Sequence, residues 1–211
     1  MNHYKNHQKI FQQIKDYIYS SENKKVVDEF LQLFEVLYKS YDSKINENKF
    51  IVGGVVEFFC YVLFKKIGLE CILAGHKKNM IDLIVNNCEM SIKTSSKSII
   101  SNFIIMNRRG DNPININWNY ATIFVISGLG FGYCDPYYIN KDMLVQTSSN
   151  IQIMAKNLKK LWKDKPELFI KLNIPIKFHI EQSKIASYEI GEQIIYKNTK
   201  ILKEMLDNSK N

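Results

Sequence analysis

Residues 81–96, IDLIVNNCEMSIKTSS, place a carboxylate where a buried strand normally carries an apolar side chain. Asp82 has two apolar neighbours on each side along the chain, and burying its charge costs several kcal/mol unless a partner or a metal satisfies it. After a two-residue turn, Glu89, Ser91 and Lys93 recur at every second position, so they face the same side of their strand. A hairpin is therefore predicted to bring Asp82 close to Ser91 and Lys93.

These residue types suit the hydrolysis of a phosphodiester. Carboxylates hold Mg²⁺, which polarises a phosphate and lowers the pKa of an attacking water, and a lysine beside the metal neutralises charge that develops on the phosphate. The predicted helix 50–68 is apolar nearly all round, and Glu57 is its only acid, so this carboxylate is predicted to complete the site. The structural alternative is an ordinary strand pair in which Asp82 and Lys93 form a salt bridge.

Glu57, Asp82 and Ser91-Ile92-Lys93 together resemble the PD-(D/E)xK nuclease superfamily, to which most type II restriction endonucleases belong. The pattern of that superfamily is a helix glutamate, a strand aspartate, and a following strand that ends in (Asp/Glu)-x-Lys. The resemblance covers about residues 50–127. It implies a central mixed β-sheet flanked by helices, and Mg²⁺-dependent, site-specific cleavage of double-stranded DNA.

Two positions depart from the pattern. Ile81 stands where a proline usually precedes the aspartate, and Ser91 stands where the acid of the (Asp/Glu)-x-Lys pair is expected. A carboxylate from elsewhere then has to serve beside Asp82, and the candidates are Glu57 and Glu89. We favour Glu57, because Glu89 lies at the turn end of the hairpin. The predicted catalytic residues are Asp82, Lys93, Glu57 and Ser91, and the predicted metal ligands are Asp82, Glu57 and Glu89.

The only two arginines among 29 basic residues are adjacent, Arg108 and Arg109. Arginine can donate two hydrogen bonds to one guanine, so one of the pair is predicted to read a base and the other to bind a phosphate. Two solvated loop cations are the alternative. The other predicted DNA contacts are the cation Lys97 and two asparagines able to read adenine, Asn107 and Asn112. Lysines on the predicted helix 150–163 form a stripe that could follow phosphates, or simply a solvated face.

Composition agrees with a polyanionic partner but does not prove one. The net charge is +8 and the pI is about 9.1. No apolar run reaches the ~18 residues that span a bilayer, and the polar N-terminus lacks a secretory signal, so a cytoplasmic protein without a membrane partner is expected. The four cysteines are expected to be reduced thiols; a zinc site at Cys71, His76 and Cys88 has no usual ligand spacing.

The pattern of apolar residues predicts alternating helices and strands. Helices are expected at 5–41 (two), 50–68, 150–163 and 190–206, and strands at 70–74, 80–85, 89–94, 120–127, 133–139 and 174–180. Residues 96–106 are expected to be a short helix or irregular chain. This order predicts an α/β or α+β fold with a central mixed sheet flanked by helices, in one domain over residues 1–211: a helical N-terminal region (1–47), a catalytic core (48–127) and completing elements (128–211).

Three functions fit these observations. The first is a sequence-specific, Mg²⁺-dependent endonuclease of the restriction type, acting as a homodimer on double-stranded DNA. The dimer contact would come from the N-terminal helices or from the segment GLGFGYCDPYY. The second is a structure-specific nuclease, such as a Holliday-junction resolvase. The third is a non-catalytic DNA-binding protein, with Ser91 as the mark of a lost active site.

Overall fold

A mixed six-stranded sheet forms the centre of the molecule in the computed structural model, which describes residues 3–41, 46–74, 81–95, 103–108, 118–139, 141–147, 150–175 and 187–208. The strand order is β1-β2-β3-β5-β6-β9, and β3 and β5 are parallel while the other neighbours are antiparallel. The strands are β1 (Cys71–Leu73), β2 (Leu83–Val85), β3 (Cys88–Ser95), β5 (Ala121–Ile126), β6 (Gly130–Cys134) and β9 (Phe169–Lys171). This arrangement confirms the predicted mixed sheet.

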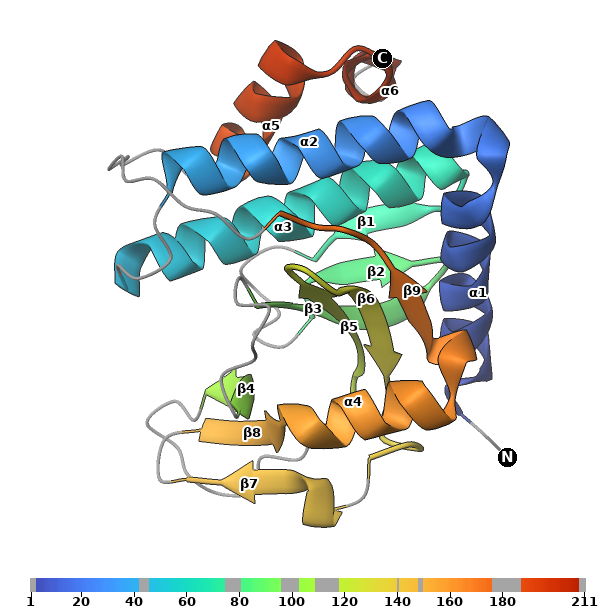
Figure 1. The fold of residues 1–211 in the computed structure, drawn as a ribbon, viewed down its shortest axis with the longest axis vertical. Helices are drawn as coiled ribbons and strands as arrows, with labels where there is room; N and C mark the ends of the chain where they lie inside the picture. The colour runs from blue at the N-terminus through green and yellow to red at the C-terminus, as the bar shows by residue number, and fades with distance from the viewer. Residues whose placement is uncertain are drawn as a thin grey trace.

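Helices cover both faces of this sheet (Figure 1). The helices are α1 (Lys5–Tyr19), α2 (Lys24–Ser40), α3 (Asn46–Ile67), α4 (Ala155–Asp164), α5 (Ser187–Asn198) and α6 (Ile201–Asn208). The first three lie on one face, where Phe11 of α1 contacts the ring of Tyr133 at 5.4 Å. On the opposite face α4 packs through Trp162, whose ring lies 5.8 Å from that of Phe124. Helices α5 and α6 pack against α2 and α3.

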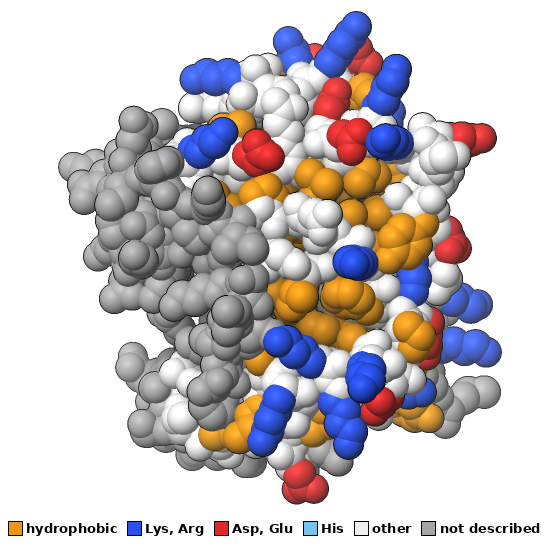
Figure 2. Space-filling model, in the orientation of Figure 1, with side chains coloured by type: hydrophobic (Ala, Val, Ile, Leu, Met, Phe, Trp, Pro, Cys, Tyr) orange, Lys and Arg blue, Asp and Glu red, His pale blue; other side chains and the backbone are white. Residues whose placement is uncertain are grey.

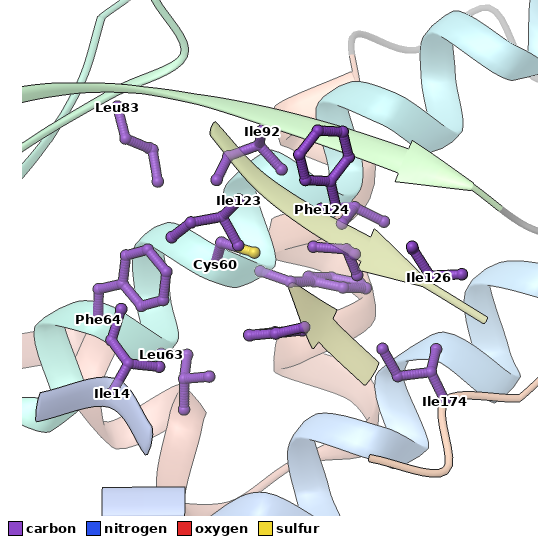
Figure 3. Packing of buried hydrophobic residues seen from close by; sticks show 14 of the residues in the cluster. Ile14, Cys60, Leu63, Phe64, Leu83, Ile92, Ile123, Phe124, Ile126 and Ile174 are labelled. Atoms are coloured by element: carbon purple, nitrogen blue, oxygen red, sulfur yellow. The ribbon is translucent and has the colours of Figure 1, made fainter. Parts of the chain in front are cut away.

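The core lies between the sheet and the N-terminal helices, as Figure 3 shows for Ile92 and Ile123 of the sheet and for Cys60 and Phe64 of α3. All four side chains are at most 3% exposed. Helix α3 is buried along most of its described length, which explains its nearly continuous apolar sequence. None of the described helices is both long and apolar enough to cross a membrane.

The turn between β2 and β3 is formed as predicted. Asn86 and Asn87 both have positive φ, 46° and 61°. Two left-handed residues in succession make the hairpin turn that matches the twist of antiparallel strands, and asparagine tolerates this conformation better than other side chains do. The turn fixes the register Leu83↔Met90, Ile84↔Glu89 and Val85↔Cys88.

A second, three-stranded antiparallel sheet was not predicted. Its order is β4-β8-β7, with β4 at Phe103–Arg108, β7 at Leu144–Gln146 and β8 at Asn150–Met154. The expectation of a helix or irregular chain over 96–106 is therefore wrong for residues 103–106, since Ile104 pairs with Ile153. The predicted helix 150–163 begins only at Ala155, because NIQIM alternates between partly and fully buried side chains, as a strand does.

Three further boundaries differ from expectation. A strand was predicted at residues 133–139, but the observed strand β6 runs from Gly130 to Cys134. The difference arises because Gly130 and Gly132 lie inside the strand. A Cβ on Gly132 would lie 2.1 Å from the Trp162 ring, so only glycine allows α4 to pack there. No strand is formed at residues 174–175, and the rest of the predicted strand 174–180 lies outside the described residues. The predicted helix 190–206 is two helices, α5 and α6.

All four cysteines are free thiols, as expected. Because His76 lies outside the described residues, the structure does not test a zinc site that includes it. The segment GLGFGYCDPYY is an unsuitable source of a dimer contact over most of its length, because residues 130–135 are buried in the sheet. Tyr137 alone in that segment is a large exposed side chain, at 66%.

Glu29 of α2 explains the break between α5 and α6. Its carboxylate accepts hydrogen bonds from the backbone amides of Ile201 (3.1 Å) and Leu202 (3.2 Å), at the first two positions of α6. Those amides have no partner within the helix, and a negative charge there also interacts favourably with the helix dipole. Glu29 thus attaches the C-terminal helices to α2.

Replacing Glu29 by Ala is expected to lower the free energy of unfolding by about 1 kcal/mol, the typical cost of losing a helix N-cap. Urea denaturation followed by circular dichroism measures this loss. Glu35→Ala is the matched control, because Glu35 is exposed on the same helix. Equal stability of the two variants would mean that the Glu29 cap contributes nothing.

Candidate active site

Asp82 directly precedes β2 and still takes part in the backbone hydrogen bonds of the sheet. Its amide donates to the carbonyl of Met90 (3.0 Å), and its carbonyl accepts from the amide of Ala74 (3.0 Å). The paired register ends at Leu83↔Met90, and the Asp82 amide donates to the carbonyl of that same Met90, so the chain bulges at Asp82. The tight turn still brings Asp82 close to Ser91, whose hydroxyl lies 2.8 Å from the Asp82 carboxylate.

Three donors converge on one oxygen of the Asp82 carboxylate. The Ser91 hydroxyl (2.8 Å), the Ile92 amide (2.6 Å) and the Lys93 ammonium (3.5 Å) all reach Oδ2. None of the residues in the described ranges donates a hydrogen bond to Oδ1. The Asp82 side chain is 19% exposed and that of Lys93 23%, so solvent reaches both. Oδ2 is thus held in place, while Oδ1 is the oxygen left for another ligand.

Ser91 has a structural reason to be a serine. It is only 2% exposed, and its hydroxyl serves Asp82 as a donor. A buried hydroxyl is stable only when it is hydrogen-bonded, and Asp82 satisfies it. The geometry therefore gives Ser91 the role of holding the Asp82 carboxylate.

The carboxyl of Glu57, which belongs to α3, lies near Asp82 and Lys93. Burial and the negative charge of Asp82 raise the pKa of Glu57 to about 8, against the opposing effects of Lys93 and of a hydrogen bond from Tyr188. The Tyr188 hydroxyl donates to Glu57 Oε2 at 3.3 Å. The mutual influence of these charges shows that the three predicted residues Glu57, Asp82 and Lys93 lie near one another.

Sequence reasoning missed Tyr188. This residue is 131 positions from Glu57 and lies on α5, where nothing in the local sequence marks it as part of a site. Only the packing of α5 on α3 brings the two together.

The two carboxylates fit a hard divalent cation such as Mg²⁺. Glu57 and Asp82 together carry two negative charges when ionised, and Lys93 supplies one positive charge beside them. Mg²⁺ is commonly bound through one or two carboxylates and keeps several of its waters. In the described ranges, no group of three or more His, Cys, Asp or Glu side chains is placed to hold a metal. Glu89 pairs with Ile84 and therefore lies two positions nearer the turn than Ser91.

None of the five predicted DNA-binding side chains lies within what the structure describes. Arg109, Lys97 and Asn112 are outside the described residues altogether, and for Arg108 and Asn107 only the backbone is described, in β4. These five DNA contacts remain predictions.

The basic stripe of α4 is formed on the surface. The lysines at positions 156, 159, 160 and 163 are all exposed, and they recur at the spacing of one helix face. Figure 2 shows Lys side chains gathered over α4. Trp162, on the buried face of the helix, contacts Phe124, the register partner of Lys93. Helix α4 therefore covers the sheet face to which Lys93 belongs.

Comparisons with known proteins support the fold. No family model matches the chain, and no curated protein matches it in sequence. Among solved structures, the chain is similar to a restriction endonuclease in complex with substrate DNA, with a TM-score of 0.55 and 15% identity. The match covers 87% of this chain and 98% of that chain. At this identity the likeness concerns the fold, and it confirms the predicted restriction endonuclease-like architecture.

The raised pKa of Glu57 predicts a stability cost that depends on pH. Because the folded-state pKa of about 8 lies above the ordinary value of 4.5, the folded protein retains a proton that the unfolded chain loses. The free energy of unfolding therefore begins to fall as the pH rises above 4.5 and continues to fall until the pH reaches about 8. Above that pH the contribution of Glu57 no longer changes. Glu57→Gln is expected to melt several degrees higher than the wild type at pH 8 in EDTA, and at the same temperature at pH 4.

Thermal denaturation of both proteins at the two pH values measures this difference. Glu35→Gln serves as the control, because Glu35 is exposed and its replacement should give no pH-dependent difference. A Glu57→Gln variant that is no more stable at pH 8 than at pH 4, relative to the wild type, would contradict a buried carboxyl at this position.

Proposed function

We propose that this protein is a Mg²⁺-dependent endonuclease that cleaves double-stranded DNA, with Glu57, Asp82 and Lys93 at its active site. The observation that carries the proposal is the proximity of these three side chains, which come from α3, from the residue before β2 and from β3. The similar solved structure, a restriction endonuclease in complex with substrate DNA, supports the choice of substrate. An Asp82–Lys93 salt bridge alone would not account for a partly buried glutamate placed near it.

Each residue has a distinct role in the proposed reaction. The Asp82 Oδ1 atom and the Glu57 carboxylate would hold Mg²⁺, which when bound polarises the phosphate and lowers the pKa of a water. Ser91 and the Ile92 amide keep Asp82 oriented through Oδ2. Lys93 neutralises charge on the phosphate oxygens while the water oxygen bonds to phosphorus and one P–O ester bond breaks. The leaving oxygen takes a proton from solvent, and the attacking water releases one.

We further propose that the enzyme is sequence-specific, of the restriction type, and acts as a homodimer. Arg108 is the last residue of β4, which pairs with β8, and Arg109 is the next residue in the sequence. Arginine is the residue that most often reads guanine in the major groove. A two-fold dimer would place one active site on each strand of a palindromic sequence.

Lys93→Ala and Asp82→Asn are each expected to reduce cleavage by at least ~100-fold, because each removes charge from the reacting centre. Binding of DNA is expected to persist in both. The assay is digestion of plasmid DNA with Mg²⁺ or with EDTA, alongside a mobility shift with the same DNA. Lys24→Ala, an exposed lysine at the start of α2, is the control.

The same digest separates the alternative functions. Discrete double-strand fragments indicate a restriction-type enzyme, whereas nicking restricted to branched junctions indicates a resolvase. If the wild type binds DNA but cuts neither substrate, and Lys93→Ala binds equally well, the protein is a non-catalytic DNA-binding protein and the proposed function is wrong.

Replacing the four exposed lysines of α4 by Gln is expected to weaken DNA binding and to flatten its salt dependence. Each lost phosphate contact should reduce the slope of log K against log salt by roughly 0.9. Fluorescence anisotropy at several salt concentrations measures the slope. The matched control replaces four exposed lysines of α1 and α2, at positions 5, 9, 24 and 25. Equal slopes for the two quadruple variants would show that α4 does not lie along the DNA.

A further inference from the structure

The ring of Tyr188 is held by the contact between α5 and α3. It stacks on Phe58 with a centroid distance of 5.8 Å and an interplanar angle of 29°. One turn later on α5, Gly191 lies against the same phenylalanine, where an added Cβ would be 3.0 Å from the Phe58 ring. Two aromatic rings in an offset stack stabilise one another beyond the area they bury. The position of the Tyr188 hydroxyl is therefore set by packing.

The Tyr188 hydroxyl donates a hydrogen bond to the Glu57 carboxyl. It reaches Oε2 at 3.3 Å, and no other residue in the described ranges donates to the Glu57 carboxyl. Oε2 is thus engaged in the same way as Oδ2 of Asp82, and Oε1 is the oxygen left for another ligand.

We propose that Tyr188 is a positioning residue, which orients the Glu57 carboxylate for a divalent cation through its hydroxyl. This inference rests on the proposed function. Groups that hydrogen-bond to metal ligands fix the orientation of those ligands, and their loss typically weakens metal binding by ~10–100-fold. Helix α5 is thereby part of the active site, although it lies far from the predicted catalytic core in sequence.

Tyr188→Phe tests the proposal, because it keeps the ring on Phe58 and removes only the hydroxyl. The matched control is Tyr196→Phe, on the same helix, whose hydroxyl donates to Asp207 instead. Mg²⁺ binding to each protein without DNA is measured by isothermal titration calorimetry, and the Mg²⁺ concentration for half-maximal cleavage is measured on plasmid DNA. Thermal denaturation in EDTA confirms that each variant is folded.

Tyr188→Phe is expected to bind Mg²⁺ about 10-fold more weakly and to require more Mg²⁺ for cleavage, with the rate recovering at saturating Mg²⁺. Tyr196→Phe should behave as the wild type does. If Glu57→Gln loses Mg²⁺ affinity but Tyr188→Phe keeps it within twofold, the inference about Tyr188 is overturned and the proposed function stands. If the wild type binds no Mg²⁺ and cuts no DNA, both are overturned.

Discussion

The proximity of the Asp82 carboxylate and the Glu57 carboxyl is the constraint on which the candidate site depends. Burial, and then the negative charge of Asp82, raise the pKa of Glu57 to about 8. Two partly buried acids remain side by side only where the fold supplies donors for them. The β2–β3 hairpin supplies a hydroxyl, an amide and an ammonium to Asp82, and α5 supplies the Tyr188 hydroxyl to Glu57. Such pairs are frequent in functional sites, because the destabilised arrangement is what a ligand can relieve.

The parts of the fold that were predicted correctly depend on local sequence. The hairpin follows from Asn86-Asn87, and it brings Asp82 within hydrogen-bond distance of Ser91. Helix α3 and strand β5 follow from long apolar runs. The errors fall where a distant segment decides the outcome: β4 and β8 pair with each other, Gly132 stays inside a strand because Trp162 packs on it, and Glu29 of α2 caps the start of α6.

The candidate site likewise has residues that were predicted from local sequence and a residue that only distant packing brings there. Glu57 and Asp82 were predicted because each is a charged residue in an apolar setting, and Lys93 because of its two-residue spacing from Ser91. The structure places the three near one another. Tyr188 carries no such signal, since one tyrosine on an amphipathic helix looks like any other. Its role depends on the stack with Phe58, which exists only after α5 has packed on α3. Positioning groups are difficult to predict for this general reason: their partner defines them, and the partner is remote in sequence.

Ser91 connects the part of the candidate site that was predicted from local sequence with the part that depends on distant segments. The resemblance to the PD-(D/E)xK superfamily calls for an acid at this position, yet a carboxylate at Ser91 would put a like charge opposite Asp82 and remove the donor that Oδ2 now has. With a serine here, Asp82 is firmly held, but the hairpin contributes one carboxylate to the site instead of two. In the proposed function the second carboxylate is that of Glu57 on α3, which has the Tyr188 hydroxyl as its donor. The serine at position 91 then explains why the proposed site, built on Asp82, depends on Glu57 and, through Glu57, on helix α5, which carries Tyr188.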